Sequence, residues 1–565
     1  MKNKNIHQNL SGGQAVIESL KAENVTHVFG LIGSATMELF DALYDEKDIN
    51  FIDVRDERTG AHMADGYARA SGKPGIIIAG QNGPGATNLV TGVAQAKAAF
   101  SPLISIAGAI STEHEGKDAF QEVDQQSLFE PITKKTFTVR HTNKIPEVLN
   151  QAFNIATTDR CGPVHVNFPR DVLANNYNFS DFHQHQKKLV PKISEHDLLK
   201  SIEIILKSKQ PVIVAGGGIK NTRGHKEVID LAKHFNIPIV SSAGHGDAIP
   251  FNEILYAGQM GPRGNPVASK LVKEADVIIA LGTRLGFNST FYSYDNINKK
   301  ASIIQVDIEP KSLGRYFPIT IGICNDVKTF TSELYKKTKK LKKNRQNSIW
   351  TNNFVKERQN YLKNRDSEAN LNEYPIHPTG LFKILRETLP INSSLTLDAG
   401  TLCLQATDMF NFLGPRSLFT PLDFGLVGFS FTCGLGVKLA KPESPVISLM
   451  GDGGFGMTLS ELSTAVKHQI NTVTIVMNNK SWGAEKAYQR DFYNKRYIGA
   501  DIDSPPFDKV AELYGARGYH VETISEIKGS VEDALQCNKP AVINVDIDPK
   551  ALYSFRRDSF KHKEN

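Results

Sequence analysis

The sequence contains no long apolar run and few cysteines, and each shortage excludes a class of protein. No stretch approaches the roughly 20 apolar residues that a transmembrane helix needs, so we expect no membrane-spanning segment. The five cysteines are scattered and form no C-x-x-C pair, which argues against a disulfide framework or a cysteine metal site. The amino terminus lacks the apolar core of a secretion signal. These absences predict a cytoplasmic protein with reduced cysteines.

The net positive charge of the chain comes from one segment. The 565 residues carry a formal net charge of +6, and Lys336–Arg345 holds seven lysines and arginines without an acid. Removing those seven charges from the +6 leaves −1, so a spread basic face for nucleic acid is not supported. The segment is either a solvated helix face or a patch that contacts an anion or RNA. We favour the solvated face, because exposed helix is expected at a domain boundary, and predict no nucleic-acid partner.

Short β-branched apolar runs alternate with longer helical stretches along the whole chain, which is the pattern of parallel sheets covered by helices. The runs form three series, so we predict an α/β protein with three doubly wound parallel-sheet domains. The predicted units are an N-terminal domain at 1–185, a central Rossmann-like domain at 195–335, a C-terminal domain at 375–552 and a tail at 553–565. The polar stretch at 175–192 is predicted to be a linker.

Two polar clusters follow strands of the predicted C-terminal domain. One is Gly451-Asp452-Gly453-Gly454, which leads into a helix, and 24 residues separate Gly453 from Asn478-Asn479 after the next strand. Open α/β sheets bind ligands at the carboxyl ends of their strands, and glycines let backbone N–H groups approach a phosphate. Asp452 and Asn479 offer the hard oxygen ligands that suit Mg²⁺. A Gly-Asp-Gly turn is common by itself, but the paired asparagines at this spacing make the pattern specific.

This combination resembles the motif of thiamine diphosphate enzymes. The resemblance implies that thiamine diphosphate and Mg²⁺ are the cofactors, and that three residues hold the metal: Asp452, Asn479 and, through its backbone carbonyl, Ser481. It also implies that the cofactor is bound by Gly451, Asp452, Gly453, Gly454, Asn479 and Trp482.

The family also uses a glutamate in the N-terminal domain. Residues 55–68 (RDERTGAHMADGYA) resemble the segment around it, which implies that Glu57 hydrogen-bonds the aminopyrimidine ring and promotes its imino form. The alternative is a surface carboxylate that caps a helix beside Arg55 and Arg58. Many relatives carry histidine where this chain has Asp56. A neighbouring carboxylate would raise the proton affinity of Glu57 unless solvent or Arg55 cancels the effect, and the sequence leaves both outcomes open.

Further segments match the family. In the N-terminal domain the match implies that Gly33, Ser34, Asn82, Gly83 and Gln121 lie at the reactive end of the cofactor, with Gln121 as a catalytic residue. In the C-terminal domain it implies cofactor binding by Gly400, Thr401, Gly425 and Val427, of which Val427 props the cofactor into a bent shape. Tight turns and ordinary core packing are the alternative interpretations of these segments.

The whole-chain layout resembles the acetolactate synthase-like enzymes, and four segments point to the sulfoacetaldehyde acetyltransferase branch. They are FGLIGSA at 29–35, AFQEVDQ at 119–125, SWGAEK at 481–486 and SFRRD at 554–558. The resemblance implies conversion of sulfoacetaldehyde and phosphate to acetyl phosphate and sulfite, as in taurine degradation. An acetolactate synthase or a 2-oxoacid decarboxylase is the alternative. Intact Glu57, Asp452 and Asn479 argue against a regulatory protein on a retired enzyme fold.

Sulfoacetaldehyde and phosphate are both anions, so their site needs fixed positive charge. We assign catalytic roles to Lys486, Arg556 and Arg557 because they lie in the branch-specific segments. The alternative is that the two arginines fasten the tail to the body of the protein.

The resemblance also bears on assembly and on the central domain. In this family the N-terminal glutamate and the metal-binding cluster meet across a subunit interface, which implies a homodimer at minimum and a homotetramer as the full assembly. Gly216–Gly218 follow a strand in the central domain but do not complete a G-x-G-x-x-G motif. A structural role for this domain is therefore favoured over flavin binding.

Overall fold

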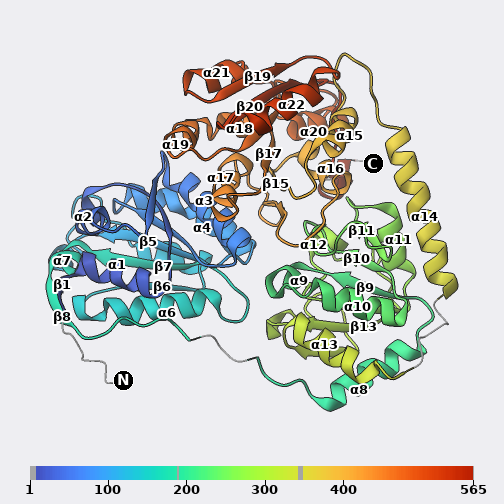
Figure 1. Cartoon of the computed structure of the whole chain (residues 1–565), viewed down its shortest axis with the longest axis horizontal. Helices are drawn as coiled ribbons and strands as arrows, with labels where there is room; N and C mark the ends of the chain where they lie inside the picture. Colours follow the sequence, from blue (N-terminus) through green and yellow to red (C-terminus); the bar gives the residue numbers. More distant parts are fainter. Residues whose placement is uncertain (1–7, 187–189, 342–347, 556, 564–565) are drawn as a thin grey trace.

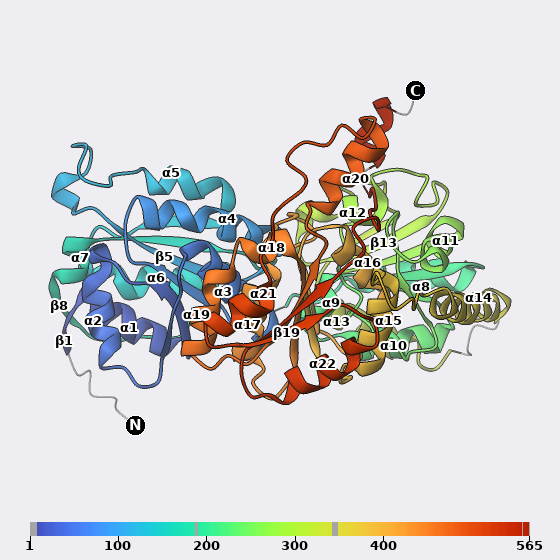
Figure 2. The ribbon, with the colours of Figure 1, turned by 90° about the horizontal axis from the view of Figure 1, so that it is seen from above.

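The computed structural model describes residues 8–186, 190–341, 348–555 and 557–563. Three six-stranded parallel sheets, each covered by helices on both faces, occupy the corners of a triangle (Figure 1). This confirms the predicted fold class, while the exact domain boundaries remain predictions. Viewed from above, the N-terminal and central sheets lie at opposite ends of the molecule with C-terminal elements between them (Figure 2).

The N-terminal sheet has the strand order β3-β2-β4-β5-β7-β6. Its strands are β2 (His27–Leu31), β3 (Asn50–Asp53), β4 (Gly75–Ala79), β5 (Leu103–Ala109), β6 (Lys135–Thr138) and β7 (Val164–Pro169). Its helices are α1 (Gly12–Ala22), α2 (Met37–Tyr44), α3 (Glu57–Ser71), α4 (Pro84–Ala98), α5 (Gln125–Phe129), α6 (Ile145–Thr157) and α7 (Arg170–Ala174). All five residues of β4 are buried, as expected for a central strand covered on both faces.

The central sheet has the order β11-β10-β9-β12-β13-β14, which is the dinucleotide-fold order. Its strands are β9 (Pro211–Ala215), β10 (Ile239–Ser241), β11 (Tyr256–Gln259), β12 (Val277–Leu281), β13 (Ser302–Asp307) and β14 (Ile321–Cys324). Its helices are α8 (Glu195–Lys207), α9 (Gly217–Thr222), α10 (His225–Phe235), α11 (Pro266–Glu274), α12 (Phe287–Thr290) and α13 (Val327–Thr338). This strand order confirms the predicted Rossmann-like topology.

The C-terminal sheet, β16-β15-β17-β18-β20-β19, repeats the strand order of the N-terminal sheet. Its strands are β15 (Ser394–Leu397), β16 (Leu418–Phe419), β17 (Val446–Gly451), β18 (Val473–Asn478), β19 (Arg517–Val521) and β20 (Ala541–Asp546). Its helices are α15 (Pro378–Thr388), α16 (Thr401–Met409), α17 (Ser430–Ala440), α18 (Asp452–Gly456), α19 (Leu462–Lys467), α20 (Gly483–Phe492), α21 (Phe507–Leu513), α22 (Glu526–Gln536) and α23 (Arg557–Phe560). Helix α14 (Ser348–Ser367) connects this domain to the central one along the outer edge of the molecule (Figure 1).

The predicted linker is partly structured. Its first residues form β8 (Asn176–Phe179), which pairs antiparallel with β1 (Gln8–Ser11) in a separate two-stranded sheet. The polar composition of this segment concealed the strand, because only Phe179 of β8 is buried and the partner strand lies more than 160 residues earlier in the chain. Prediction of a linker was therefore wrong for residues 176–179.

The N- and C-terminal domains of one chain share an apolar core that joins α3 to α17. Glycines let the two helices approach closely: a Cβ atom on Gly436 would lie 1.8 Å from the carbonyl oxygen of Met63, and one on Gly66 would lie 2.3 Å from that of Cys433. Because α3 begins at Glu57, this contact fixes the helix that carries the predicted catalytic glutamate.

The glycines at the start of α9 serve close packing in the same way. A Cβ atom on Gly216 would lie 2.2 Å from the carbonyl oxygen of Gly282, and one on Gly217 would lie 2.9 Å from the His245 ring. The space beside this turn is therefore filled by the protein's own atoms, and a structural role for the central domain stays a prediction.

Part of the lysine-rich segment lies in the described residues. Lys336 pairs with Glu333 at 2.8 Å and Lys337 with Glu195 at 2.6 Å, so two of its charges are compensated on the surface, whereas residues 342–347 lie outside the described part of the chain. Among the helices that the structure describes, none has the length and apolar character to cross a membrane. The described cysteines Cys161, Cys324, Cys433 and Cys537 are free thiols.

Candidate active site

The two polar clusters of the C-terminal domain lie at one edge of its sheet. Strands β17 and β18 are parallel neighbours with Gly451 opposite Met477, so Asp452 and Asn479 follow adjacent strand ends. The helix after the first cluster starts earlier than its apolar pattern predicts: α18 begins at Asp452 itself, and a 3₁₀ turn (Leu459–Glu461) separates it from α19. The sequence pattern missed α18 because its glycines are poor helix formers.

The carboxylate of Asp452 is buried and only partly satisfied. Its Oδ2 accepts a hydrogen bond from the Ser504 hydroxyl at 2.6 Å, whereas among the described residues Oδ1 has no partner. Asn479 Oδ1 accepts the backbone N–H of Ser481 at 3.2 Å, and the buried Ser481 hydroxyl also has no partner in the described chain. Burial raises the pKa of Asp452 above its usual range. Since an unpartnered buried carboxylate oxygen is costly, this donor set suits a divalent cation.

Close contacts explain the glycines around Asp452. A Cβ atom on Gly453 would lie 2.6 Å from the Trp482 ring, and one on Gly454 would lie 2.2 Å from a carboxylate oxygen of Asp398. Larger residues at either position would displace the turn, so the second and third glycines of the Gly-Asp-Gly-Gly motif are required by their neighbours.

Asp398 organises this edge of the sheet, a role that the sequence reasoning missed. It directly follows β15, and its carboxylate accepts backbone N–H groups from Ala399 at 2.9 Å and from Gly428 and Phe429 at 3.0 Å. Burial raises the pKa of Asp398 to about 6, although the three backbone donors oppose the shift. An acid immediately after a buried strand was the available signal, since Asp452 follows its own strand in the same way.

A cavity of about 370 Å³ opens at this edge, between the C-terminal and central domains. Every C-terminal residue predicted to bind cofactor or metal lines it: Gly400, Thr401, Gly425, Val427, Gly451, Asp452, Gly453, Gly454, Asn479, Ser481 and Trp482. Gly400 requires its residue type, because its φ of +121° is rarely adopted by other residues. The structure therefore brings the whole C-terminal set together.

The residues of the N-terminal domain that are predicted to lie at the reactive end of the cofactor, here called the N-terminal set, also lie close together, at the carboxyl edge of their own sheet. Asn82 donates a side-chain hydrogen bond to the Gln121 carbonyl at 2.9 Å, and a Cβ atom on Gly83 would lie 2.6 Å from the same oxygen. Gly33 packs against the backbone of Gly80, while the Ser34 hydroxyl accepts a hydrogen bond from Gln81 Nε2 at 3.1 Å. Gln121 itself has a φ of +63°, so its loop holds a strained conformation.

Glu57 is a buried side chain and not a surface cap. It is 4% exposed, and its Oε2 accepts a hydrogen bond from Asn88 Nδ2 at 3.0 Å. Asp56 caps α3 instead, accepting the Arg58 backbone N–H at 2.7 Å. Burial is the main cause that raises the pKa of Glu57, and the charge of Asp56 adds to it less strongly than burial does. The charge of Asp56 therefore reinforces the shift and is not fully cancelled.

The C-terminal domain of the same chain clamps the turn before Glu57. The buried carboxylate of Glu461 accepts the Arg55 backbone N–H at 2.9 Å, and it also accepts the hydroxyls of Thr59 and Thr464. His468 hydrogen-bonds Asp53 at 2.6 Å on the strand before this turn. These contacts hold the start of α3 between two domains and restrict the position of Glu57.

The N-terminal set and the cavity are separate within one chain. Among the described residues that line the cavity, none comes from the N-terminal domain, so Glu57, Gln121 and their neighbours lie elsewhere in the monomer.

Among the residues predicted to bind anions, none that the structure describes lines the cavity. Lys486 forms an ion pair with Asp501 and lies over the Tyr497 ring, and it does not line the cavity. Arg556 lies outside the described residues, and of Arg557 the structure shows only that it begins α23. Phe555, which precedes them, does line the cavity.

Comparison with known families agrees with this division into three units. The models described as thiamine pyrophosphate enzyme N-terminal TPP binding domain, central domain and C-terminal TPP binding domain match residues 10–128, 198–334 and 398–545. The chain belongs to the thiamine pyrophosphate enzyme family. Thiamine diphosphate is accordingly its cofactor, with the Mg²⁺ that is typical of the family.

Individual relatives place this thiamine pyrophosphate enzyme in the acetolactate synthase-like group. A probable acetolactate synthase large subunit from Methanococcus aeolicus is 34% identical, covering 96% of this chain and 93% of the relative. Sulfoacetaldehyde acetyltransferases from Castellaniella defragrans and Alcaligenes xylosoxydans xylosoxydans are each 32% identical, covering 98% and 97% of this chain and 96% and 95% of the relatives.

Proposed function

We propose that this enzyme is a sulfoacetaldehyde acetyltransferase, which converts sulfoacetaldehyde and inorganic phosphate to acetyl phosphate and sulfite. Bound thiamine diphosphate supplies the nucleophilic carbon and the electron sink for this reaction. Glu57 is the proposed proton-exchanging carboxyl, and Asp452, Asn479 and the Ser481 carbonyl are the proposed metal ligands. We propose the cytoplasm as its compartment.

The position of the branch-specific segments supports this assignment. Residues 481–485 of the SWGAEK segment and Phe555 of the tail segment line the cavity. Residues that resemble sulfoacetaldehyde acetyltransferases therefore line the same cavity as the proposed cofactor-binding residues, which supports the proposal. We retain Lys486, Arg556 and Arg557 as proposed contributors of positive charge for phosphate, with Gln121 as a further proposed catalytic residue.

Acetolactate synthase is the second candidate, because relatives with that name are 34% identical to the chain, against 32% for the sulfoacetaldehyde acetyltransferases. The two reactions use different substrates and release different products. A sulfoacetaldehyde acetyltransferase releases sulfite in a phosphate-dependent reaction, whereas an acetolactate synthase releases carbon dioxide from pyruvate.

An assay of purified protein with thiamine diphosphate, Mg²⁺, phosphate and sulfoacetaldehyde tests the proposal. We expect sulfite and acetyl phosphate in equal amounts, and at least about 100-fold lower kcat/KM with pyruvate, the scale that polar recognition in a fitted site supplies. Omission of phosphate is the control. Carbon dioxide from pyruvate without sulfite from sulfoacetaldehyde would assign the enzyme to the second candidate.

We further propose that the working unit is a homodimer at minimum, and that two such dimers form a homotetramer. In support, the cavity contains the complete C-terminal set but no N-terminal residue among the described residues that line it. A second copy of the chain would supply Glu57 and Gln121, so each site would use two chains.

Mixed assemblies test this arrangement. E57Q and D452A chains are each expected to be inactive, but in a mixed dimer one site combines the intact Asp452 of the first chain with the intact Glu57 of the second. Co-expression should restore about a quarter of wild-type activity, since about half of the dimers are mixed and each has one intact site. Mixed dimers without activity would show that both residues act within one chain.

A further inference from the structure

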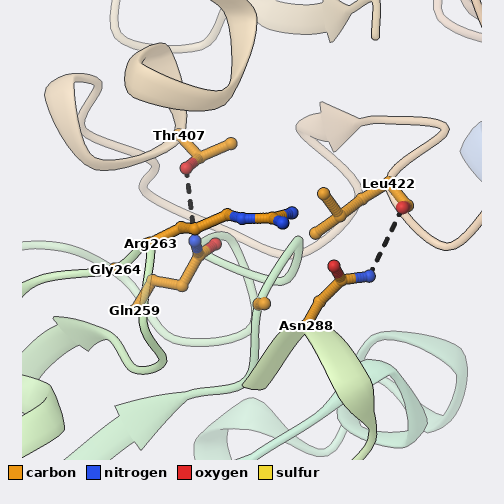
Figure 3. Close-up of a pocket in the computed structure, with 7 residues that line it drawn as sticks. Gln259, Arg263, Gly264, Asn288, Thr407 and Leu422 are labelled. Atoms are coloured by element: carbon orange, nitrogen blue, oxygen red, sulfur yellow. Dashed lines mark hydrogen bonds between the residues drawn. The ribbon is translucent and has the colours of Figure 1, made fainter. Parts of the chain in front are cut away.

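A small second cavity adjoins the cofactor cavity, and Arg263, Asn288 and Leu422 line both (Figure 3). Asp452 and Asn479 line only the larger cavity. Arg263 therefore stands at the end of the cofactor cavity that adjoins the small one. Figure 3 shows its side chain reaching from the central domain towards Leu422 of the C-terminal domain.

The loop that carries Arg263 between β11 and α11 is rigidly held. The Ser269 hydroxyl accepts the N–H of Gly261 at 3.1 Å and lies 3.0 Å from its carbonyl oxygen. The Asn265 backbone N–H donates to the Gln259 carbonyl at 2.7 Å, and Asn265 caps α11 with its side chain. A residue presented by such a loop is positioned before a ligand arrives, which lowers the entropy cost of binding.

The charges around the cavity are mostly negative. The described ionisable acids that line it are Asp398, Asp423, Asp452 and Glu485, and Arg263 is the only lysine or arginine among the described lining residues. Asp423 forms an ion pair with Arg284 at 3.4 Å, and Arg284 does not line the cavity. Among the described side chains that line the cavity, only Arg263 would offset these acids beside an anionic substrate.

We infer that Arg263 binds the anionic group of the substrate, which is the sulfonate of sulfoacetaldehyde if the proposed function holds. Its guanidinium lies over the Phe291 ring, 5.3 Å from the centroid. A guanidinium is planar and carries paired N–H donors, the geometry that binds two oxygens of a sulfonate or carboxylate together. Phe287 and Phe424 also line the cavity and reduce screening by water.

The diphosphate of the cofactor is the competing ligand for Arg263. Its proposed site is the glycine turn after β17 with the metal at Asp452, and these residues do not reach the small cavity that Arg263 borders. Arg263 is thus assigned to substrate, and affinity for the cofactor distinguishes the two roles.

Calorimetric titration of the holoenzyme with 2-hydroxyethanesulfonate, an unreactive sulfonate, tests the inference. We expect R263Q to bind this sulfonate about 100-fold more weakly than wild type, as for loss of one partner of a buried charge pair. R263K should bind the sulfonate with an affinity between those of wild type and R263Q, because lysine keeps the charge but not the bidentate geometry. R315Q, at an exposed arginine of the same domain, should bind like wild type.

Thiamine diphosphate affinity of each variant should stay within about twofold of wild type, since phosphate contacts lie elsewhere. An equal loss of sulfonate and cofactor affinity would assign Arg263 to the diphosphate and overturn the inference. The inference would also be overturned if wild type and R263Q bound the sulfonate equally well, or if neither bound it. Failure of the proposed function is recognised separately, as a wild-type enzyme that releases no sulfite.

Discussion

Glu57→Gln is expected to lower kcat by about 100-fold to 10,000-fold, the usual contribution of one positioned acid–base group. Glutamine matches glutamate in size, and its carbonyl oxygen still accepts the hydrogen bond from Asn88, so the side chain stays in place. In the proposed role its amide would donate a hydrogen bond to a ring nitrogen of the bound cofactor but could not exchange a proton with it. Steady-state kinetics would measure the loss of turnover, and cofactor titration would measure any loss of binding. We expect cofactor affinity to change by less than about tenfold.

The pH profile gives a second measurement of the same variant. Burial raises the pKa of Glu57, so its protonated form persists to higher pH than that of an exposed glutamate. Activity that needs this proton falls as pH rises through the raised pKa, and we expect the corresponding alkaline limb in wild type. The limb should be absent in E57Q, whose amide does not titrate.

Glu113→Gln is the matched control, because Glu113 is an exposed glutamate of the same domain with a side chain 76% accessible. We expect its kcat and pH profile to match those of wild type. Near wild-type turnover by E57Q would remove Glu57 from the catalytic role, and an equal loss in both variants would point to damage of the N-terminal domain.

Asp452→Ala is expected to weaken cofactor binding by more than 100-fold, about 3–5 kcal/mol, because one ligand of a buried cation is lost. Asn479, Ser481 and the cofactor phosphates would then have to hold Mg²⁺ alone. Asp452→Asn keeps one oxygen but not the charge, so we expect an intermediate loss. Titration with thiamine diphosphate at fixed Mg²⁺ measures both variants.

Thermal unfolding offers an independent measurement. A ligand that binds only the folded state stabilises it by about 2.7 kcal/mol at 100 times its Kd, so cofactor and Mg²⁺ should raise the Tm of wild type. A chelator should reverse this shift in wild type and have no effect on D452A. D503A, at an exposed neighbouring acid, is the control and should keep the shift. A full shift in D452A would exclude Asp452 as a metal ligand.

The sequence identified the residues whose roles depend on local geometry. Asp452–Gly454 and Asn479 follow buried strands, and parallel strands that are neighbours must end at one edge of the sheet, so their convergence follows from the chain order. Glu57 is predicted to be the acid–base group because it lies in a long run of residues that match the family, and this role stays a prediction. Strand β8 escaped prediction, since its partner lies at the other end of the domain and its composition is polar.

What the sequence by itself determined is the chemistry of each half of the site: a carboxyl in the first domain, and oxygen ligands with a glycine turn in the third. Only the tertiary structure decided where Glu57 lies in the chain, because its position depends on the contacts of α3 with Glu461 and α17. It also revealed Arg263, whose loop has no motif and becomes significant only because another domain packs against it. Packing between domains depends on surfaces built from distant residues, which no local pattern encodes.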